Sequence, residues 1–130
     1  MNMGLDQYIF ATKSEKNLSP TDTRLPLRSN RKRFFYWRKH PDLHEFMKIL
    51  YQKKGGQDEH FNGNMVELEM EDIVVLAETM NEGEMPHMEG RFFGYSNNSN
   101  KFNEIETRIF IIKAYTALCN GKRLYYYGDW

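Results

Sequence analysis

The residues best suited to hold a charged or aromatic partner lie in one short segment, Arg28–His40, which reads RSNRKRFFYWRKH. Six Arg or Lys residues flank four consecutive aromatic residues, and the segment contains no Asp or Glu. Cationic side chains bind phosphates or acidic protein surface, whereas aromatic rings stack on bases or anchor protein interfaces. The candidate binding residues are Arg28, Arg31, Arg33, Tyr36, Trp37, Arg38, Lys39 and His40.

The aromatic part of this segment also has a purely structural interpretation. If Arg33–Lys39 forms a strand, its side chains alternate between the two faces of a sheet. Phe35 and Trp37 then lie on one face, with Phe34 and Tyr36 on the other, which favours a central strand covered on both sides. The cations are the better binding candidates, because burial does not explain them.

The residues that could support catalysis or hold a metal ion form no known motif. The four histidines are scattered, and we expect them to be exposed or to cap helices. Cys119 lies near the end of an apolar helix, where a buried structural thiol is expected rather than a nucleophile. The chain lacks the Cys/His spacing of metal sites and the loop of a phosphate-binding Gly-Lys motif. We therefore assign no catalytic residue, no metal ligand and no cofactor, and expect a binding protein rather than an enzyme.

Length and composition favour a single domain with a core of its own. A chain of 130 residues can bury a core without metals or disulfides. No apolar run approaches the length of a membrane span, and the lone Cys119 excludes an intrachain disulfide framework. These features lead us to expect no membrane association and a location in a cytoplasm.

The formal charge is zero overall but unevenly distributed along the chain. Residues 1–54 carry twelve Lys or Arg and five Asp or Glu, a net of +7. Residues 55–90 carry ten acidic residues and no Lys or Arg, a net of −10, and residues 91–130 return to +3. Two interpretations remain open. The blocks meet across one fold or form two solvated faces; alternatively, they are separate patches for different partners, or the acidic block mimics nucleic acid.

Periodicity and punctuation residues predict the order of secondary-structure elements. Pro41 at a helix start, acidic residues in the first turn and Gly55–Gly56 after the last turn define the first helix. The apolar positions of the third helix include Ile105, Ile109, Ile112 and Leu118. The predicted strands are Leu5–Thr12, Arg33–Lys39, Met65–Leu68, Arg91–Tyr95 and Arg123–Tyr127, and the predicted helices are Pro41–Lys54, Met70–Asn81 and Asn103–Cys119.

This order predicts a single α+β domain over residues 1–130. We expect a mostly antiparallel sheet of about four or five strands, with three helices packed on one face. Residues 13–32, rich in polar residues and containing Pro20 and Pro26, are predicted to form a long polar and basic surface loop.

Short motifs spread over nearly the whole chain resemble a known family. They are Met3–Gly4–Leu5–Asp6–Gln7–Tyr8, Tyr36–Trp37–Arg38–Lys39, an acidic helix start after Val66–Glu67–Leu68, Phe92–Phe93–Gly94, and Tyr125–Tyr126–Tyr127 followed by Trp130. The chain is similar in these motifs to a family of small uncharacterised proteins encoded by tailed bacteriophages. It departs from that pattern at His40–Pro41, where a small residue and Asn are expected, and at Gly128–Asp129, where small hydroxyl residues are expected.

The resemblance implies a phage accessory protein in the cytoplasm of an infected bacterium, with no known activity. We therefore expect a non-enzymatic binding module that engages, and inhibits, a host protein such as a defence component. The alternative is a nucleic-acid or small-nucleotide binding protein that uses Arg28–His40. A second alternative is a small hydrolase or transferase with an unrecognised site. The sequence leaves the oligomeric state open.

Overall fold

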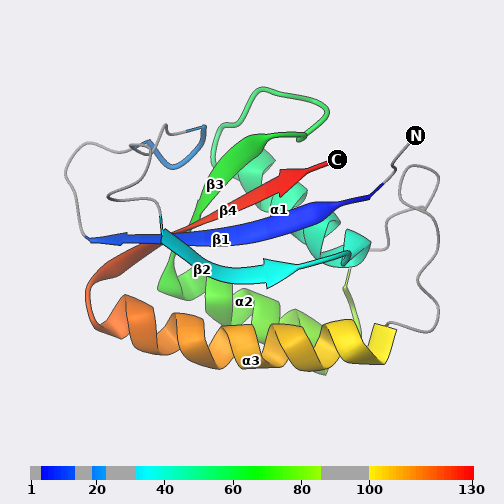
Figure 1. Ribbon diagram of the computed structural model, residues 1–130, viewed down its shortest axis with the longest axis vertical. Helices are drawn as coiled ribbons and strands as arrows, with labels where there is room; N and C mark the ends of the chain where they lie inside the picture. The colour runs from blue at the N-terminus through cyan, green and yellow to red at the C-terminus, as the bar shows by residue number, and fades with distance from the viewer. Residues whose placement is uncertain (1–3, 14–18, 23–31, 86–99) are drawn as a thin grey trace.

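The computed structural model describes residues 4–13, 19–22, 32–85 and 100–130, which form a four-stranded antiparallel sheet and three helices. The elements are β1 (Asp6–Lys13), β2 (Lys32–Trp37), α1 (Pro41–Lys53), β3 (Asn64–Leu68), α2 (Met70–Asn81), α3 (Asn100–Cys119) and β4 (Lys122–Asp129). The strand order is β2-β1-β4-β3, so the first and last strands pair at the centre (Figure 1). The α+β prediction is confirmed.

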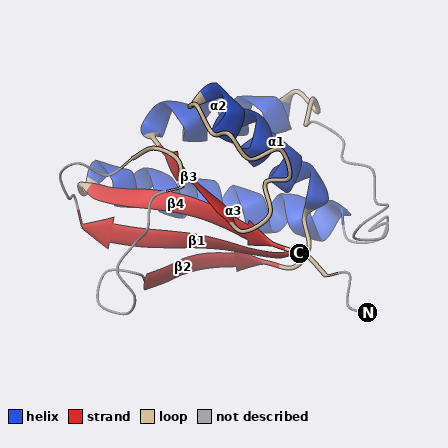
Figure 2. Cartoon of the chain, turned by 90° about the horizontal axis from the view of Figure 1, so that it is seen from above, coloured by secondary structure: helices blue, strands red, loops and turns tan. Residues whose placement is uncertain are grey.

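The fold has two layers, with all three helices on one face of the sheet (Figure 2). The main core lies between the layers and includes Ile9, Trp37, Val66 and Phe110, each at most 2% exposed. Among the described residues, no helix or strand covers the opposite face of the sheet (Figure 2). We call this opposite side the open face; it carries the side chains of the alternate strand positions, of which Phe10, Met65 and Tyr125 are at most 8% exposed and form a second buried cluster.

The bounds of α1 and α2 agree closely with those predicted from sequence, because their end signals operate locally. Pro41 is the first residue of α1, and the ring of His40 accepts a hydrogen bond from the Leu43 amide, 3.4 Å away. His40 is thus the capping residue that the sequence predicted. At the start of α2, Glu69 and Asp72 form a reciprocal capping box.

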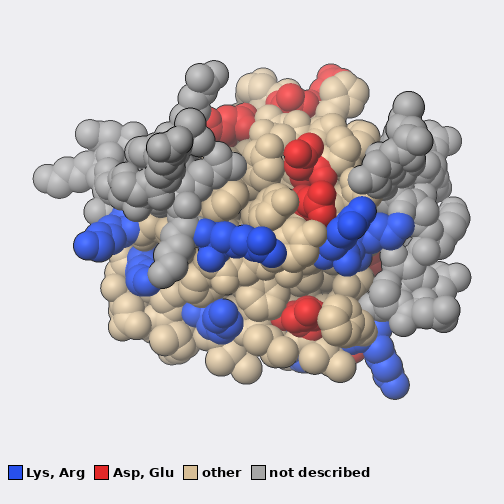
Figure 3. Space-filling view, viewed as in Figure 1, with Lys and Arg blue, Asp and Glu red and all other residues tan. Residues whose placement is uncertain are grey.

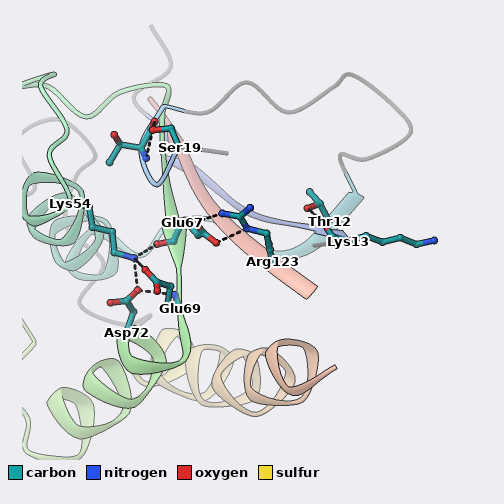
Figure 4. Close-up of polar contacts among 9 residues, drawn as sticks. Thr12, Lys13, Ser19, Lys54, Glu67, Glu69, Asp72 and Arg123 are labelled. Atoms are coloured by element: carbon teal, nitrogen blue, oxygen red, sulfur yellow. Dashed lines mark hydrogen bonds and ion pairs between the residues drawn. The ribbon is translucent and has the colours of Figure 1, made fainter. Parts of the chain in front are cut away.

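The basic and acidic blocks of the sequence meet at the junction of α1, β3 and α2. Lys54 Nζ donates to the Glu67 carbonyl at 2.7 Å, to Glu69 at 3.1 Å and to Asp72 at 2.7 Å (Figure 4). The Lys54 and Asp72 side chains are only 14% and 11% exposed, so their ion pair is poorly screened by solvent, whereas Glu69 is 64% exposed. At this junction the basic and acidic blocks contact each other within one fold, as one of the interpretations of the charge distribution predicted.

β2 differs from the prediction in two ways. It ends at Trp37 and lies at an edge of the sheet, whereas a central strand was expected. It also contains a bulge: Ile9 pairs with Phe35 and Phe10 pairs with Arg33, which leaves Phe34 unpaired. Phe34 therefore packs on the main core together with Phe35, not on the opposite face as strict alternation predicted.

The buried face of α3 also differs from the simplest interpretation of its apolar positions. The helix is buried through Asn103, Thr107, Phe110, Ala114 and Ala117. Ile105, Ile109 and Ile112 are 56%, 46% and 69% exposed, respectively. Small and hydroxyl side chains face inward because the wide Phe35 and Trp37 rings already fill the space beneath the helix, where Trp37 donates to the Thr107 hydroxyl at 3.1 Å.

Two further sequence expectations are corrected. Cys119 is exposed, not buried, because it lies on the outer face of α3, in line with the exposed Ile105, Ile109 and Ile112. His44 is fully buried on α1 rather than exposed. Of the predicted loop 13–32, Lys13 and Lys32 belong to β1 and β2, and residues 19–22 lie along the outer edge of β3, where the Glu67 amide donates to the Pro20 carbonyl. The remainder of that loop and the predicted strand Arg91–Tyr95 lie outside the described residues.

Candidate functional site

The open face of the sheet carries a continuous group of aromatic rings from three strands. Tyr8 on β1 lies between Tyr36 on β2, with ring centroids 5.2 Å apart, and Tyr127 on β4, 6.2 Å away. Tyr8 also stacks on Phe10 at 5.8 Å. The strand register explains this contact, because Tyr8 is paired directly with both Tyr36 and Tyr127. Tyr8, Tyr36 and Tyr127 are each partly exposed.

Two arginines border this aromatic group on the β2 side. The Arg33 guanidinium lies over the Tyr36 ring, 4.3 Å from its centroid, and 5.6 Å from that of Tyr8. Arg38 lies 3.6 Å from the Asp6 carboxylate and is 53% exposed. Figure 3 shows Lys and Arg side chains spread across this view of the molecule, with most acidic ones nearer its top. We call Tyr8, Tyr36, Tyr127, Arg33 and Arg38 the tyrosine–arginine surface.

The bulge in β2 places Arg33 on this surface. If Phe34 were paired in strict alternation, position 33 would share the inward face of Phe35 and Trp37. With the bulge, Arg33 lies on the same face as Tyr36. Among the described residues, no carboxylate lies within ion-pair distance of Arg33.

Asp6 organises the other end of the tyrosine–arginine surface. Tyr36 donates its hydroxyl proton to the Asp6 carboxylate at 2.8 Å. Burial, and beyond it the bond to Asp6, raises the pKa of the Tyr36 hydroxyl, so the ring stays neutral. Because Asp6 also pairs with Arg38, that arginine contributes less net positive charge than Arg33.

A second polar feature on the open face is the pair Arg123–Glu67, which links β4 to β3 (Figure 4). Two guanidinium nitrogens of Arg123 donate to the two carboxylate oxygens, each at 2.8 Å. These hydrogen bonds raise the pKa of the Arg123 guanidinium. The ion pair is bidentate and has no net charge. It therefore joins the two strands and does not attract an anion.

The sequence-predicted candidates divide between surface and interior. The structure brings Arg33, Tyr36 and Arg38 together on the open face. Trp37 is 2% exposed and points into the core, so the stacking role considered for it is wrong. The carbonyl of Lys39 accepts a hydrogen bond from Asn103, and His40 is 9% exposed at the start of α1. Arg28 and Arg31 lie outside the described residues.

Sequence reasoning missed Tyr8 and Tyr127 as site residues. Both lie in predicted strands, but only the pairing of β1 with β4 brings them beside Tyr36. The available signal was alternation: Asp6, Tyr8 and Phe10 share one face of β1, opposite the buried Gln7 and Ile9.

Beneath the open face lies a buried polar network that is structural. The Tyr126 hydroxyl donates to His44 Nδ1 at 2.7 Å and accepts from Gln7 at 3.0 Å, and His44 Nε2 donates to the Phe61 carbonyl at 2.9 Å. This set of bonds requires neutral His44, and burial lowers the pKa of His44 to about 4. Gly128 makes room for it, since a Cβ there would lie 2.6 Å from the His44 ring.

A cleft of about 330 Å³ opens beside the start of α1, lined by His40, Asp42, Met80, Gly83, Met85, Lys101 and Glu104. It contains a histidine and two carboxylates, but neither Arg38 nor an acidic side chain of α2 lines it. The His40 ring already accepts the Leu43 amide, and burial lowers the pKa of His40 to about 4. The described residues contain no group of three His, Cys, Asp or Glu that could hold a metal ion.

Comparison of the chain with known protein families, curated proteins and solved structures finds no match. Within the described part of the chain, no helix is both long and apolar enough to cross a membrane.

Proposed function

We propose that this protein is a non-enzymatic binding module whose tyrosine–arginine surface binds a single-stranded nucleic acid or a nucleotide. The observation that carries the proposal is the stack of Arg33 on Tyr36 beside Tyr8, on a sheet face that no described element covers. Aromatic rings on the open face of a four-stranded sheet can stack unpaired bases, and a neighbouring arginine can hold the phosphate.

The geometry favours single strands over a duplex. Stacking needs bases that are splayed away from a partner strand, and the surface is a shallow platform rather than a helix shaped for a groove. The zero formal charge of the chain also argues against tight binding to the duplex backbone, which depends on many cationic contacts. A short ligand held by a few rings and Arg33 needs no large basic surface.

Binding is tested with a fluorescently labelled single-stranded oligonucleotide at low salt, read by anisotropy. Replacing Arg33 by Gln is expected to weaken binding by roughly tenfold and to reduce the salt slope by about one unit. Replacing Tyr36 by Leu removes one stacking ring and is expected to weaken binding about tenfold or more.

Lys53→Gln is the matched control, because it removes the same charge from an exposed residue on α1. Its affinity should equal that of the unmodified protein. Absence of binding at low salt, or equal losses in Arg33→Gln and Lys53→Gln, would contradict the proposal.

A second candidate function is the one the family resemblance implies: a phage accessory protein that binds and inhibits a host protein, such as a defence component. It is favoured by a groove of about 520 Å³ between α1 and α2. Phe46, Ile49, Leu50 and Val75 provide its apolar lining, and Lys53, Glu71 and Glu84 give it charged borders. Such a groove suits an extended or helical segment of a partner protein.

This candidate is tested by capture from bacterial lysate with the unmodified protein and with Val75→Glu, which places a charge in the groove without disturbing a buried residue. A partner retained by the first protein and lost by the second supports it. A captured set that is the same for both proteins excludes the groove.

A further inference from the structure

The outer face of α3 exposes large apolar side chains that the protein's own fold does not use. Phe102, Ile105, Ile109 and Ile112 are 60%, 56%, 46% and 69% exposed, and we call them the α3 stripe. They lie opposite the face through which the helix is buried. Figure 1 shows α3 along one border of the molecule, with its outer face directed away from the sheet and from α2. An exposed apolar group of this size typically marks an interface.

The spacing of the α3 stripe is that of a coiled-coil seam. Its members are separated by three, four and three residues, so they occupy alternate a and d positions of a heptad repeat, which continues at Thr116 and Cys119. The side chains that pack on the core occupy other heptad positions. A helix that is buried on one face and carries a heptad seam on the opposite face is suited to pair with a second helix.

The charges beside the stripe select the occupant and its direction. Glu106 and Lys113 are seven residues apart and occupy the same flank, the e positions of successive heptads; Arg108 occupies the other flank, a g position. In a parallel pair of identical helices, Arg108, which pairs with Glu104 of its own copy at 3.3 Å, would face the partner's Lys113 and gain no opposite charge. In an antiparallel pair, e positions face each other, so Glu106 of each copy meets Lys113 of the other.

We propose that the protein forms a symmetric homodimer in which the α3 stripes of two copies pack antiparallel. The two-fold axis passes between Ile109 and Ile112, so that each Ile109 meets the other copy's Ile112. Two equivalent Glu106–Lys113 ion pairs form across the interface, as two-fold symmetry requires. Phe102 of each copy then lies near Cys119 of the other, and the two Cys119 residues are at opposite ends of the interface.

Sedimentation equilibrium across a range of concentrations tests the dimer. The unmodified protein is expected to associate to a dimer, and Ile112→Glu is expected to raise the dissociation constant at least tenfold. Val74→Glu is the matched control, since Val74 is an exposed apolar residue on α2 that belongs to neither the α3 stripe nor the groove between α1 and α2. A protein that stays monomeric at every concentration overturns the proposal, as does equal weakening by both variants.

Charge reversal tests the direction of packing. Lys113→Glu places two carboxylates opposite each other in the antiparallel dimer and weakens it, whereas it would strengthen a parallel dimer by facing Arg108. The double variant Glu106→Lys with Lys113→Glu is expected to recover most of the affinity. Strengthening by Lys113→Glu alone overturns the antiparallel arrangement.

The single native cysteine gives an independent readout. Under mild oxidation, Phe102→Cys is expected to give a dimer cross-linked between position 102 of one copy and Cys119 of the other, identified by peptide mass spectrometry. The unmodified dimer is not expected to form a Cys119–Cys119 disulfide, because the antiparallel arrangement separates the two thiols. Efficient Cys119–Cys119 cross-linking within the dimer contradicts it.

Discussion

Acidification from pH 7 to pH 4 is expected to remove about 5 kcal/mol from the free energy of unfolding through His40 and His44 together. Burial is the main cause that lowers the pKa of each histidine from 6.5 to about 4; Asp42 opposes it at His40, and the Phe61 carbonyl opposes it at His44. Below pH 6.5 the unfolded chain takes up two protons that the folded protein does not. The contribution is therefore complete above pH 6.5 and is lost as the pH falls through the window from 6.5 to 4.

The loss is large because folded domains of this kind are stable by only about 5–15 kcal/mol. Denaturant unfolding measured at intervals between pH 7 and pH 4 should show the decline. His40→Asn keeps a side-chain acceptor at the start of α1 and removes one titrating group, so it should remove roughly half of the pH dependence.

His44→Gln should remove the other half, even though it also disturbs the bonds to Tyr126 and Phe61. The proton resonances of the two rings give a direct check by NMR. Titration midpoints near 6.5 for both histidines in the folded protein would show that the rings are accessible to water, and the prediction would be wrong.

Replacing Phe110 by Ala is expected to cost about 3–5 kcal/mol of stability, the largest effect of a single substitution that we expect on α3. Phe110 is fully buried, and its ring centroid lies 5.0 Å from that of Trp37, in an edge-to-face contact, and 5.5 Å from that of Phe35. The truncation leaves a cavity between α3 and β2 that these rigid rings cannot refill, because the strand pairing fixes their position.

Ile112→Ala is the matched control for this prediction, two residues further along the same helix. At 69% exposure, Ile112 should contribute no more than about 0.5 kcal/mol to the stability of the monomer. Both variants should be measured by denaturant unfolding at low protein concentration, where association adds little to the apparent stability. Equal losses would mean that the inward face of α3 has been misassigned.

Sequence alone predicted the elements whose limits are set by nearby residues. The bounds of α2 agree with Met70–Asn81, because the capping box at Glu69 and Asp72 acts within one turn. The position of β2 depends on distant pairing instead. Nothing within Lys32–Trp37 indicates that this segment will pair with β1, which carries Tyr8. Nor does it indicate that no other strand in the described part of the chain will pair with β2.

The same distinction applies to the candidate site and to α3. Arg33, Tyr36 and Arg38 were found from their types, whereas Trp37 was assigned wrongly because its direction depends on which face the helices cover. In α3 two apolar patterns overlap, and periodicity cannot tell which of them faces the core. Phe110 rather than Ile109 faces the core because it packs on the aromatic rings of Phe35 and Trp37 in β2, which are remote in sequence.

The bulge at Phe34 has a consequence for how this surface can be gained or lost. If Phe34 paired with Phe10 instead of bulging out of the ladder, the inward and outward positions of the strand before it would be exchanged. Arg33 would then be directed at the core, although no residue of the tyrosine–arginine surface had been substituted. Deletion of Phe34 would leave Arg33 paired with Phe10 on the open face, so the register of β2, rather than the length of the segment before Tyr36, decides whether Arg33 belongs to this surface.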